Sequence, residues 1–324
     1  MFKSFLLPCC RYVIPASCLK QAKRHLKLGL LITFQYQTIR SRSHCLKPRN
    51  KNTTFGIQMA ENMSTDASSG FTGTVDRYKG VHISSVENPS DLVTFTSKLE
   101  ASLNHWVAEK MLAVWFLVSL EQSDWIPVLT KNCFRFHHTG CDGSTVSLVR
   151  WLDSSPSRVP VFAHTMVGVG AVVVDKDGRL LVVQESYRGQ PYWKLPGGYV
   201  EPGEDISVAA MREVQEETNI VTEFKSLIAF RHSHSAQFGC SDLYFIVELA
   251  PLSSTITSCE VEIEDSQWMD MDTYLSHPNV HENNRLFVRK YLFSKEKGLS
   301  INGTKTLHPV TKAPQTLFAL GDIE

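Results

Sequence analysis

One predicted helix places three carboxylates on a single face, and this feature most constrains what the chain can be. Glu213, Glu216 and Glu217 stand at positions i, i+3 and i+4, which a helix of 3.6 residues per turn brings to one side. Like charges at this spacing repel by roughly 0.2–0.5 kcal/mol per pair, and the adjacent sequence offers only Arg212 to offset them. Because carboxylate oxygens are the ligands that Mg²⁺ and Mn²⁺ prefer, the stretch predicts a metal-binding helix.

The residues on either side of this helix predict its loop and its two ends. Gly197 and Gly198 precede it and let the backbone approach a metal or a phosphate without a Cβ in the way. Pro202-Gly203 predicts a turn, and Asp205 is the expected N-cap. Asn219 follows the helix, where a left-handed residue is expected to end it.

Residues 198–220 resemble the Nudix box at fixed spacing. That pattern reads Gly, five residues, Glu, seven residues, Arg-Glu, an aliphatic residue, any residue, Glu-Glu, any residue, Gly and an aliphatic residue. This chain supplies Gly198, Glu204, Arg212-Glu213, Val214, Glu216-Glu217 and Ile220. The one departure is Asn219 in place of the second glycine, and Asn is the next best residue for a left-handed helix end.

The resemblance extends beyond the box and implies a fold. One Nudix subfamily, whose plant members include ADP-ribose and NADH pyrophosphatases, is similar at several further positions. These are His164, Val167 and Gly168, residues 193–198, Phe238-Gly239 and Ser241-Asp242. The resemblance implies an α/β/α sandwich with a mixed sheet, preceded by a small α/β domain of acetyltransferase-like topology. That first domain has no glycine-rich acyl-CoA loop, so acetyl transfer is not expected.

The resemblance also implies roles for the residues of the box. Glu213, Glu216 and Glu217 would hold Mg²⁺ or Mn²⁺, joined by the carbonyl of Gly197 or Gly198. Glu213 could act instead as the base that deprotonates water, and the sequence leaves these two roles open. Glu204 and Arg212 are expected to form an ion pair that orients the glutamates. These five charged residues are the predicted catalytic set: Glu204, Arg212, Glu213, Glu216 and Glu217.

Substrate contacts are expected from residues outside the box. Arg231 and His234 follow a predicted strand that should end near the site, where either could contact a phosphate. Phe238 or Trp193 could stack on an adenine ring, although core packing is the ordinary role for Trp193. Glu262, in an acidic stretch before Trp268, is the expected additional carboxylate, and a solvated acidic loop is the alternative.

Charge and composition divide the chain. Residues 1–60 hold eleven of the 33 Lys and Arg and no acid, so the rest carries 22 basic and 33 acidic residues, a formal charge near −11. An acidic body excludes broad binding of nucleic-acid backbones, which needs basic surface. The basic, acid-free leader is typical of a mitochondrial transit peptide; starts at Met59 or Met63 would instead give a cytoplasmic or nuclear form. Its apolar runs are too short to span a membrane.

The pattern along the chain predicts four regions. They are a leader and linker over 1–69, the first α/β domain over 70–158, the main domain over 160–300 and a polar tail over 301–324, of which residues 316–320 could dock. Residues 167–174 and 180–184 are expected to form a hairpin around the turn at 175–178. His137 and His138, adjacent on a predicted strand, are expected to point to opposite faces and so not to share a metal.

Two classes of function compete at this stage. The first is Mg²⁺-dependent hydrolysis of a nucleoside diphosphate derivative, with ADP-ribose or NADH as substrate and AMP as product, in a protein that could be a homodimer. The second is a regulatory or binding module that keeps the fold and does little chemistry. Hydrolysis of an RNA cap or NAD cap is a third reading, which the acidic body disfavours.

Overall fold

The computed structural model describes residues 70–321, except residues 141, 187–191 and 235. The leader and linker over 1–69, including the expected transit peptide, lie outside the described residues, as do residues 322–324. Within the described part, no helix is long and apolar enough to cross a bilayer.

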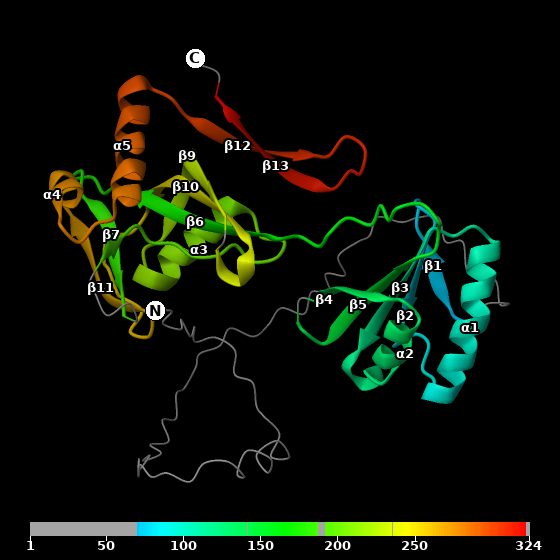
Figure 1. The fold of residues 1–324 in the computed structure, drawn as a ribbon. Helices are drawn as coiled ribbons and strands as arrows, with labels where there is room; N and C mark the ends of the chain where they lie inside the picture. Colours follow the sequence, from blue (N-terminus) through cyan, green and yellow to red (C-terminus); the bar gives the residue numbers. More distant parts are fainter. Residues whose placement is uncertain (1–69, 141, 187–191, 235, 322–324) are drawn as a thin grey trace, which may run out of the picture. The chain divides into compact units, whose positions relative to one another are not determined.

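Residues 71–152 build one sheet with helices on one of its faces (Figure 1). The elements are β1 (Gly73–Val75), β2 (Gly80–Ser84), α1 (Leu92–Ala108), β3 (Ala113–Ser119), the 3-10 turn η4 (Leu120–Gln122), α2 (Trp125–Lys131), β4 (Arg135–Thr139) and β5 (Thr145–Trp151). The strand order is β1-β2-β3-β5-β4, with β2 and β3 parallel and the other pairs antiparallel. Alternate residues of β3, such as Val114 and Phe116, meet Phe95 and Leu99 of α1 in a buried core.

The two adjacent histidines of β4 do not follow simple alternation. The register between β4 and β5 shifts between Phe136 and His138, which marks a β-bulge. As a result the two rings meet, with the Nδ1 atoms of His137 and His138 2.8 Å apart. The expectation that they point to opposite faces was therefore wrong, because a bulge places neighbouring side chains on the same side.

Residues 164–321 build the main α/β unit. Its elements are β6 (Thr165–Val173), β7 (Leu180–Glu185), β8 (Trp193–Lys194), α3 (Ile206–Thr218), β9 (Thr222–Ser233), η5 (Gln237–Gly239), β10 (Ser241–Pro251), β11 (Ile263–Met269), α4 (Met271–Ser276), α5 (Glu282–Lys297), β12 (Ile301–Leu307) and β13 (Pro314–Leu320). One sheet has the order β13-β12-β9-β10-β6 and a second has the order β11-β7-β8. The larger sheet is mixed, since β6 and β10 are parallel and its other pairs are antiparallel.

Helices cover both faces of this unit, as the alternation along β6 requires. Ala171 packs in one core cluster with Ala210 and Val214 of α3, whereas its neighbour Val172 packs in another with Val288 of α5. Two apolar cores on opposite faces of the sheet give the expected α/β/α sandwich. Figure 1 shows α3 and α5 against the strands β6, β9 and β10.

The expected hairpin between β6 and β7 forms only at its turn. Val174 and Leu180 form an isolated bridge, after which β6 pairs with β10 and β7 pairs with β8 and β11. The free edge of β6 is taken by the loop that precedes α3, with Val169 N donating to Gly198 O at 2.8 Å and Ala171 N to Pro196 O at 2.9 Å. The expectation of a paired hairpin was wrong because this loop fills the position of the partner strand.

The C-terminal residues form a hairpin rather than a polar tail. β12 and β13 pair antiparallel, and Ile301 pairs with Leu227 of β9. Phe318 makes an edge-to-face contact with Phe224 at 6.0 Å between ring centroids. The docking expected of residues 316–320 therefore occurs, through an aromatic residue that reaches the core on the α3 side.

Candidate functional site

The glycine loop brings the backbone into direct contact with strand β6. Gly197 has φ of 150°, and a Cβ there would lie 2.1 Å from Val169 O. A Cβ at Gly198 would lie 2.6 Å from a carboxylate oxygen of Glu213. The contact at Gly197 is with backbone, so no side chain fits there, whereas a side chain at Gly198 would displace the Glu213 carboxylate.

The ends of α3 agree with the residues expected there. Asp205 occupies the N-cap position, but its side chain makes no capping hydrogen bond; instead it accepts one from Thr316 Oγ1 at 3.3 Å. Asn219 has φ of 60° and ends the helix in the left-handed conformation. The Asn-for-Gly departure in the sequence pattern is therefore accommodated in the backbone.

Arg212 connects most of the acidic residues of the helix and its loop. It donates to both carboxylate oxygens of Glu204, from Nε at 2.9 Å and from Nη2 at 3.0 Å. Its Nη1 donates to Glu213 and to Glu216, each at 2.9 Å. Nη2 also donates to the carbonyl of Tyr199 at 3.0 Å. A planar guanidinium with five donors suits this arrangement, which fixes loop and helix to each other.

Glu217 is held by a different cation that the sequence pattern does not indicate. Lys194 Nζ lies 3.3 Å from Glu217 Oε1 and 2.7 Å from Glu185 Oε1. The backbone N–H of Gly197 donates to Glu217 Oε2 at 2.9 Å. Lys194 and Glu185 were missed because they are distant in sequence from Glu217 and meet it only when β7, β8 and α3 come together.

Burial makes ionisation of two of the glutamates costly. The side chain of Glu217 is 7% exposed, and burial raises its pKa to about 7, although Lys194 and the Gly197 N–H favour the ionised form. Burial also raises the pKa of Glu213, with Arg212 offsetting part of the effect. Glu216 is 59% exposed and faces solvent. A cation bound beside these groups would favour their ionised forms.

The donor set fits a hard divalent cation. Three carboxylates lie within two turns of one helix, and the Gly198 backbone contacts Glu213 where a side chain would block access. Among the described residues, no three His, Cys, Asp or Glu side chains are already arranged so that they could hold a metal ion together. Arg212 and Lys194 instead hold the carboxylates, so bound metal would have to replace some of these contacts.

Strands β9 and β10 carry polar side chains in the same sheet as β6, whose outer edge pairs with the glycine loop. Arg231 forms an ion pair with Asp242 at 2.5 Å, and its guanidinium carbon lies 5.2 Å from the centre of the Tyr244 ring. The Tyr244 hydroxyl lies over Gly170, where a Cβ would come within 2.6 Å of it. Burial raises the pKa of Tyr244 to about 12, which keeps its hydroxyl protonated.

The structure separates the predicted substrate-binding residues. Trp193 is 6% exposed and packs in the core with Val280 and Tyr274, so the expectation that it stacks on a base was wrong. Its position on β8, between β7 and the segment at Val280, buries the ring.

Phe238 is 89% exposed, with φ of 57°. The ring of His234 lies beside that of His232, and its Nδ1 is 3.0 Å from Ser241 Oγ.

Glu262 stands apart from the cluster in the described residues. Its side chain is exposed, and its backbone carbonyl accepts from Ser186 N at 3.0 Å. This places it just before β11, whose Ile263 pairs with Glu185 of β7. The structure brings Glu262 to the end of β7, the strand that holds Glu185, and among the described residues it gives the Glu262 carboxylate no contact with the box glutamates.

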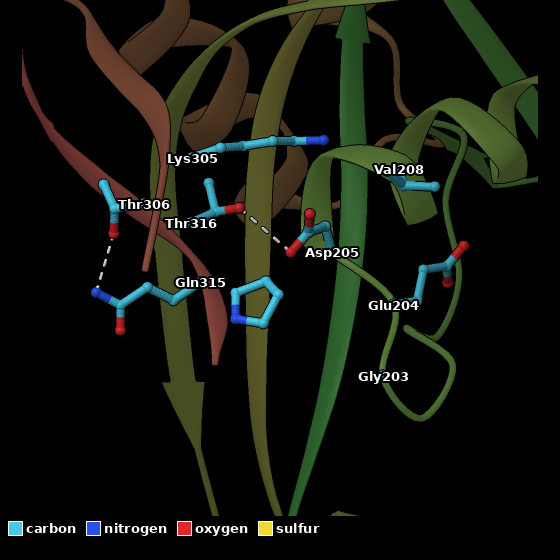
Figure 2. Close-up of a pocket in the computed structure, with 9 residues that line it drawn as sticks. Gly203, Glu204, Asp205, Val208, Lys305, Thr306, Gln315 and Thr316 are labelled. Carbon is cyan, nitrogen blue, oxygen red and sulfur yellow. Dashed lines mark hydrogen bonds between the residues drawn. The ribbon is translucent and has the colours of Figure 1, made fainter. Parts of the chain in front are cut away.

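A hollow of about 400 Å³ lies between the first turn of α3 and the C-terminal hairpin. Glu204 and Asp205 line it on one side, and Lys305 and Thr316 on the other. Figure 2 shows the Thr316 hydroxyl directed at the Asp205 carboxylate. Since Glu213, Glu216 and Glu217 do not line it, the hollow is separate from the carboxylate cluster.

Comparison with known proteins places both parts of the chain in one family. Residues 164–291 match the NUDIX domain, and residues 71–152 match a model described as Nudix hydrolase domain. Nudix hydrolase 2 of Arabidopsis thaliana is 38% identical over 66% of this chain and 77% of its own length. The human nucleoside diphosphate-linked moiety X motif 6 is 36% identical over 70% of this chain and 73% of its own length.

A further relative is longer than the region that it shares with this chain. Nudix hydrolase 8 of Arabidopsis thaliana is 38% identical over 66% of this chain, which spans 58% of that protein. The chain belongs to the Nudix hydrolase family.

Proposed function

We propose that this protein is a divalent-metal-dependent pyrophosphohydrolase that cleaves a nucleoside diphosphate derivative, with ADP-ribose or NADH as substrate and AMP as one product. The observation that carries the proposal is the carboxylate cluster of α3, in which half-buried Glu213, buried Glu217 and exposed Glu216 adjoin a glycine loop. Similarity to the nucleoside diphosphate-linked moiety X protein supports the substrate class. The subfamily resemblance of the sequence supports the choice of ADP-ribose or NADH.

In this proposal Glu213, Glu216 and Glu217 hold Mg²⁺ or Mn²⁺, with a contribution from the Gly198 carbonyl. When bound, the metal would neutralise the diphosphate and lower the pKa of a bound water. Water adds to one phosphorus, the bridging P–O bond breaks, and the second phosphoryl group leaves with that oxygen. Arg212 holds Glu213 and Glu216 in place, and Glu204 holds Arg212. Glu213 also remains the candidate base.

Three residues outside the box are proposed to contact the substrate. Arg231 supplies a cation on β9, and its ion pair with Asp242 fixes its direction. The exposed ring of Phe238 is available to stack on the adenine, and the His234 ring to contact a phosphate. Glu262 stays the candidate additional carboxylate, which requires its loop to bring it toward Glu217.

A substrate screen with the full-length protein tests the proposal. The panel holds ADP-ribose, NADH, NAD, diadenosine polyphosphates, 8-oxo-dGTP and NAD-capped RNA, each with Mg²⁺ or Mn²⁺. The Glu216→Gln variant serves as the blank, because this exposed side chain contributes least to packing. We expect one compound of the panel, ADP-ribose or NADH, to be strongly preferred and to be left intact by the blank. Hydrolysis by the blank at the wild-type rate would remove the metal assignment.

One observation favours a second candidate, a binding module with little catalytic activity. Arg212 and Lys194 pair with all three glutamates, and the ion pairs of these two cations join the helix to its loop and to β8. Equilibrium Mn²⁺ binding separates the two functions. Tight binding of ADP-ribose without turnover, and no Mn²⁺ bound at millimolar concentration, would favour the binding module.

A further inference from the structure

Lys194 joins three separate parts of the site through one ammonium group. Its Nζ lies 2.7 Å from Glu185 Oε1 on β7, 3.3 Å from Glu217 Oε1 on α3 and 3.3 Å from the carbonyl oxygen of Gly197 in the loop. A lysine ammonium has three N–H donors, so three acceptors match its capacity. No position of the box pattern accounts for this residue.

The three charged side chains are withdrawn from water together. The exposed fractions are 19% for Lys194, 9% for Glu185 and 7% for Glu217. Removing one partner from such a cluster leaves an uncompensated buried charge, which is strongly unfavourable. Tyr244 of β10 also lies near this ammonium, and the guanidinium carbon of Arg231 lies 5.2 Å from the centre of the Tyr244 ring.

The ammonium group of Lys194 lies closer to one of its two carboxylate partners than to the other. The contact of 2.7 Å with Glu185 is that of a strong charge-assisted bond, whereas 3.3 Å to Glu217 is long for one. Glu217 also has a second anchor, because its Oε2 accepts from Gly197 N at 2.9 Å. Lys194 can therefore release Glu217 Oε1 to another cation and remain paired with Glu185.

We propose that Lys194 is a positioning residue for the metal site: it orients Glu217 before metal binds and is retained by Glu185 when Glu217 turns to the metal. The inference rests on the proposed function, in which Glu217 is a metal ligand. It assigns Glu185 the role of keeping the released ammonium paired. Neither residue touches the substrate or the reacting atoms.

The test compares Mn²⁺ binding, measured by electron paramagnetic resonance, in wild type and in Lys194→Met. Loss of an outer contact to a metal ligand typically weakens metal affinity by about 10–100-fold, and we expect a change of this size. Lys194→Arg should recover part of the affinity. In steady-state assays the metal concentration for half-maximal rate should rise while the KM for substrate at saturating metal stays unchanged. Lys295→Met, which removes a surface ion pair with Glu248, is the matched control.

Glu185→Gln tests the same inference if Lys194→Met does not fold. The variant keeps the size of the side chain and keeps Lys194, but the ammonium then remains on Glu217, so Mn²⁺ binding should weaken. Wild-type or tighter Mn²⁺ affinity in folded Lys194→Met, or wild-type affinity in Glu185→Gln, overturns the inference. If the wild-type protein itself binds no Mn²⁺ and cleaves no substrate, the proposed function fails together with the inference. The behaviour of the wild type therefore separates failure of the inference alone from failure of the proposed function.

Discussion

Arg212 holds Glu204 through two hydrogen bonds, from Nε to Oε1 at 2.9 Å and from Nη2 to Oε2 at 3.0 Å. The pair links the loop before α3 to the helix, and the remaining N–H groups of Arg212 reach Glu213, Glu216 and the carbonyl of Tyr199. Burial raises the pKa of Glu204, but hydrogen bonds from Arg212 and from the Glu201 N–H, together with the charge of Arg212, lower it by more, so the pKa of Glu204 lies below its ordinary value. The pair therefore stays ionised at neutral pH.

Arg212→Lys should lower kcat/KM by about 10–100-fold, because a lysine cannot bond to Glu204 at two points and still reach Glu213 and Glu216. Steady-state assays with the preferred substrate measure this change. Arg289→Lys, at a surface pair with Glu282, should retain wild-type activity. Full activity in Arg212→Lys would contradict the orienting role.

Glu216→Gln should reduce turnover by at least about 100-fold, as expected for a metal ligand, while the melting temperature stays close to that of wild type. The physical reason is that this side chain is 59% exposed and its ion pair with Arg212 is of the surface type, which contributes about 0–1 kcal/mol. Thermal unfolding and initial rates on one preparation give both quantities. A large loss of stability would instead indicate that Glu216 supports the fold.

Gly198→Ala should abolish activity in a protein that still folds. A methyl group there would lie 2.6 Å from a Glu213 oxygen and displace that carboxylate. The control is Gly178→Ala in the turn after β6, where φ is 80° and the space is open. That variant should lose about 1–2 kcal/mol of stability from backbone strain and no activity. Equal activity in the two variants would argue against a role for the Gly198 contact.

The stability of the metal-free protein should fall as the pH rises from about 4.5 to 7. Folded Glu217 has a pKa of about 7, against 4.5 for the ordinary carboxyl, so the folded state binds more protons in this window. At pH 8 the cost is on the order of 3 kcal/mol, at about 1.4 kcal/mol per pKa unit. Urea unfolding across this range should show a flatter profile for Glu217→Gln. Saturating Mg²⁺ should restore the stability that the wild-type protein loses as the pH rises above 7. If the stability of Glu217→Gln falls with pH as steeply as that of wild type, Glu217 is not the source of this dependence.

Asn219→Gly should leave the stability unchanged or raise it, whereas Asn219→Ala should lower it by about 1 kcal/mol. The backbone φ of 60° is easy for glycine, tolerated by Asn and strained for alanine. Denaturant unfolding measures both variants. Equal stability of the alanine and glycine variants would mean that the left-handed helix end carries no cost.

The sequence predicted the features that depend on local spacing. Helical periodicity placed Glu213, Glu216 and Glu217 on one helix, and the residue types at its ends predicted both the N-cap position of Asp205 and the left-handed Asn219. The fold class was predicted from the resemblance of residues 198–220 to the Nudix box, because the matching residues stand at fixed spacings. These inferences succeed because each rests on backbone geometry within a few residues.

Tertiary structure decided the contacts between residues that are distant in the chain. The pairing of the glycine loop with the free edge of β6 separated β6 from β7. Trp193, which the sequence had offered as a substrate contact, is buried because it lies on β8 between β7 and the segment at Val280. The same arrangement brought Lys194 to Glu185 and Glu217. Which strand edge is filled depends on the register and burial of the whole sheet, so spacing along one segment could not determine it.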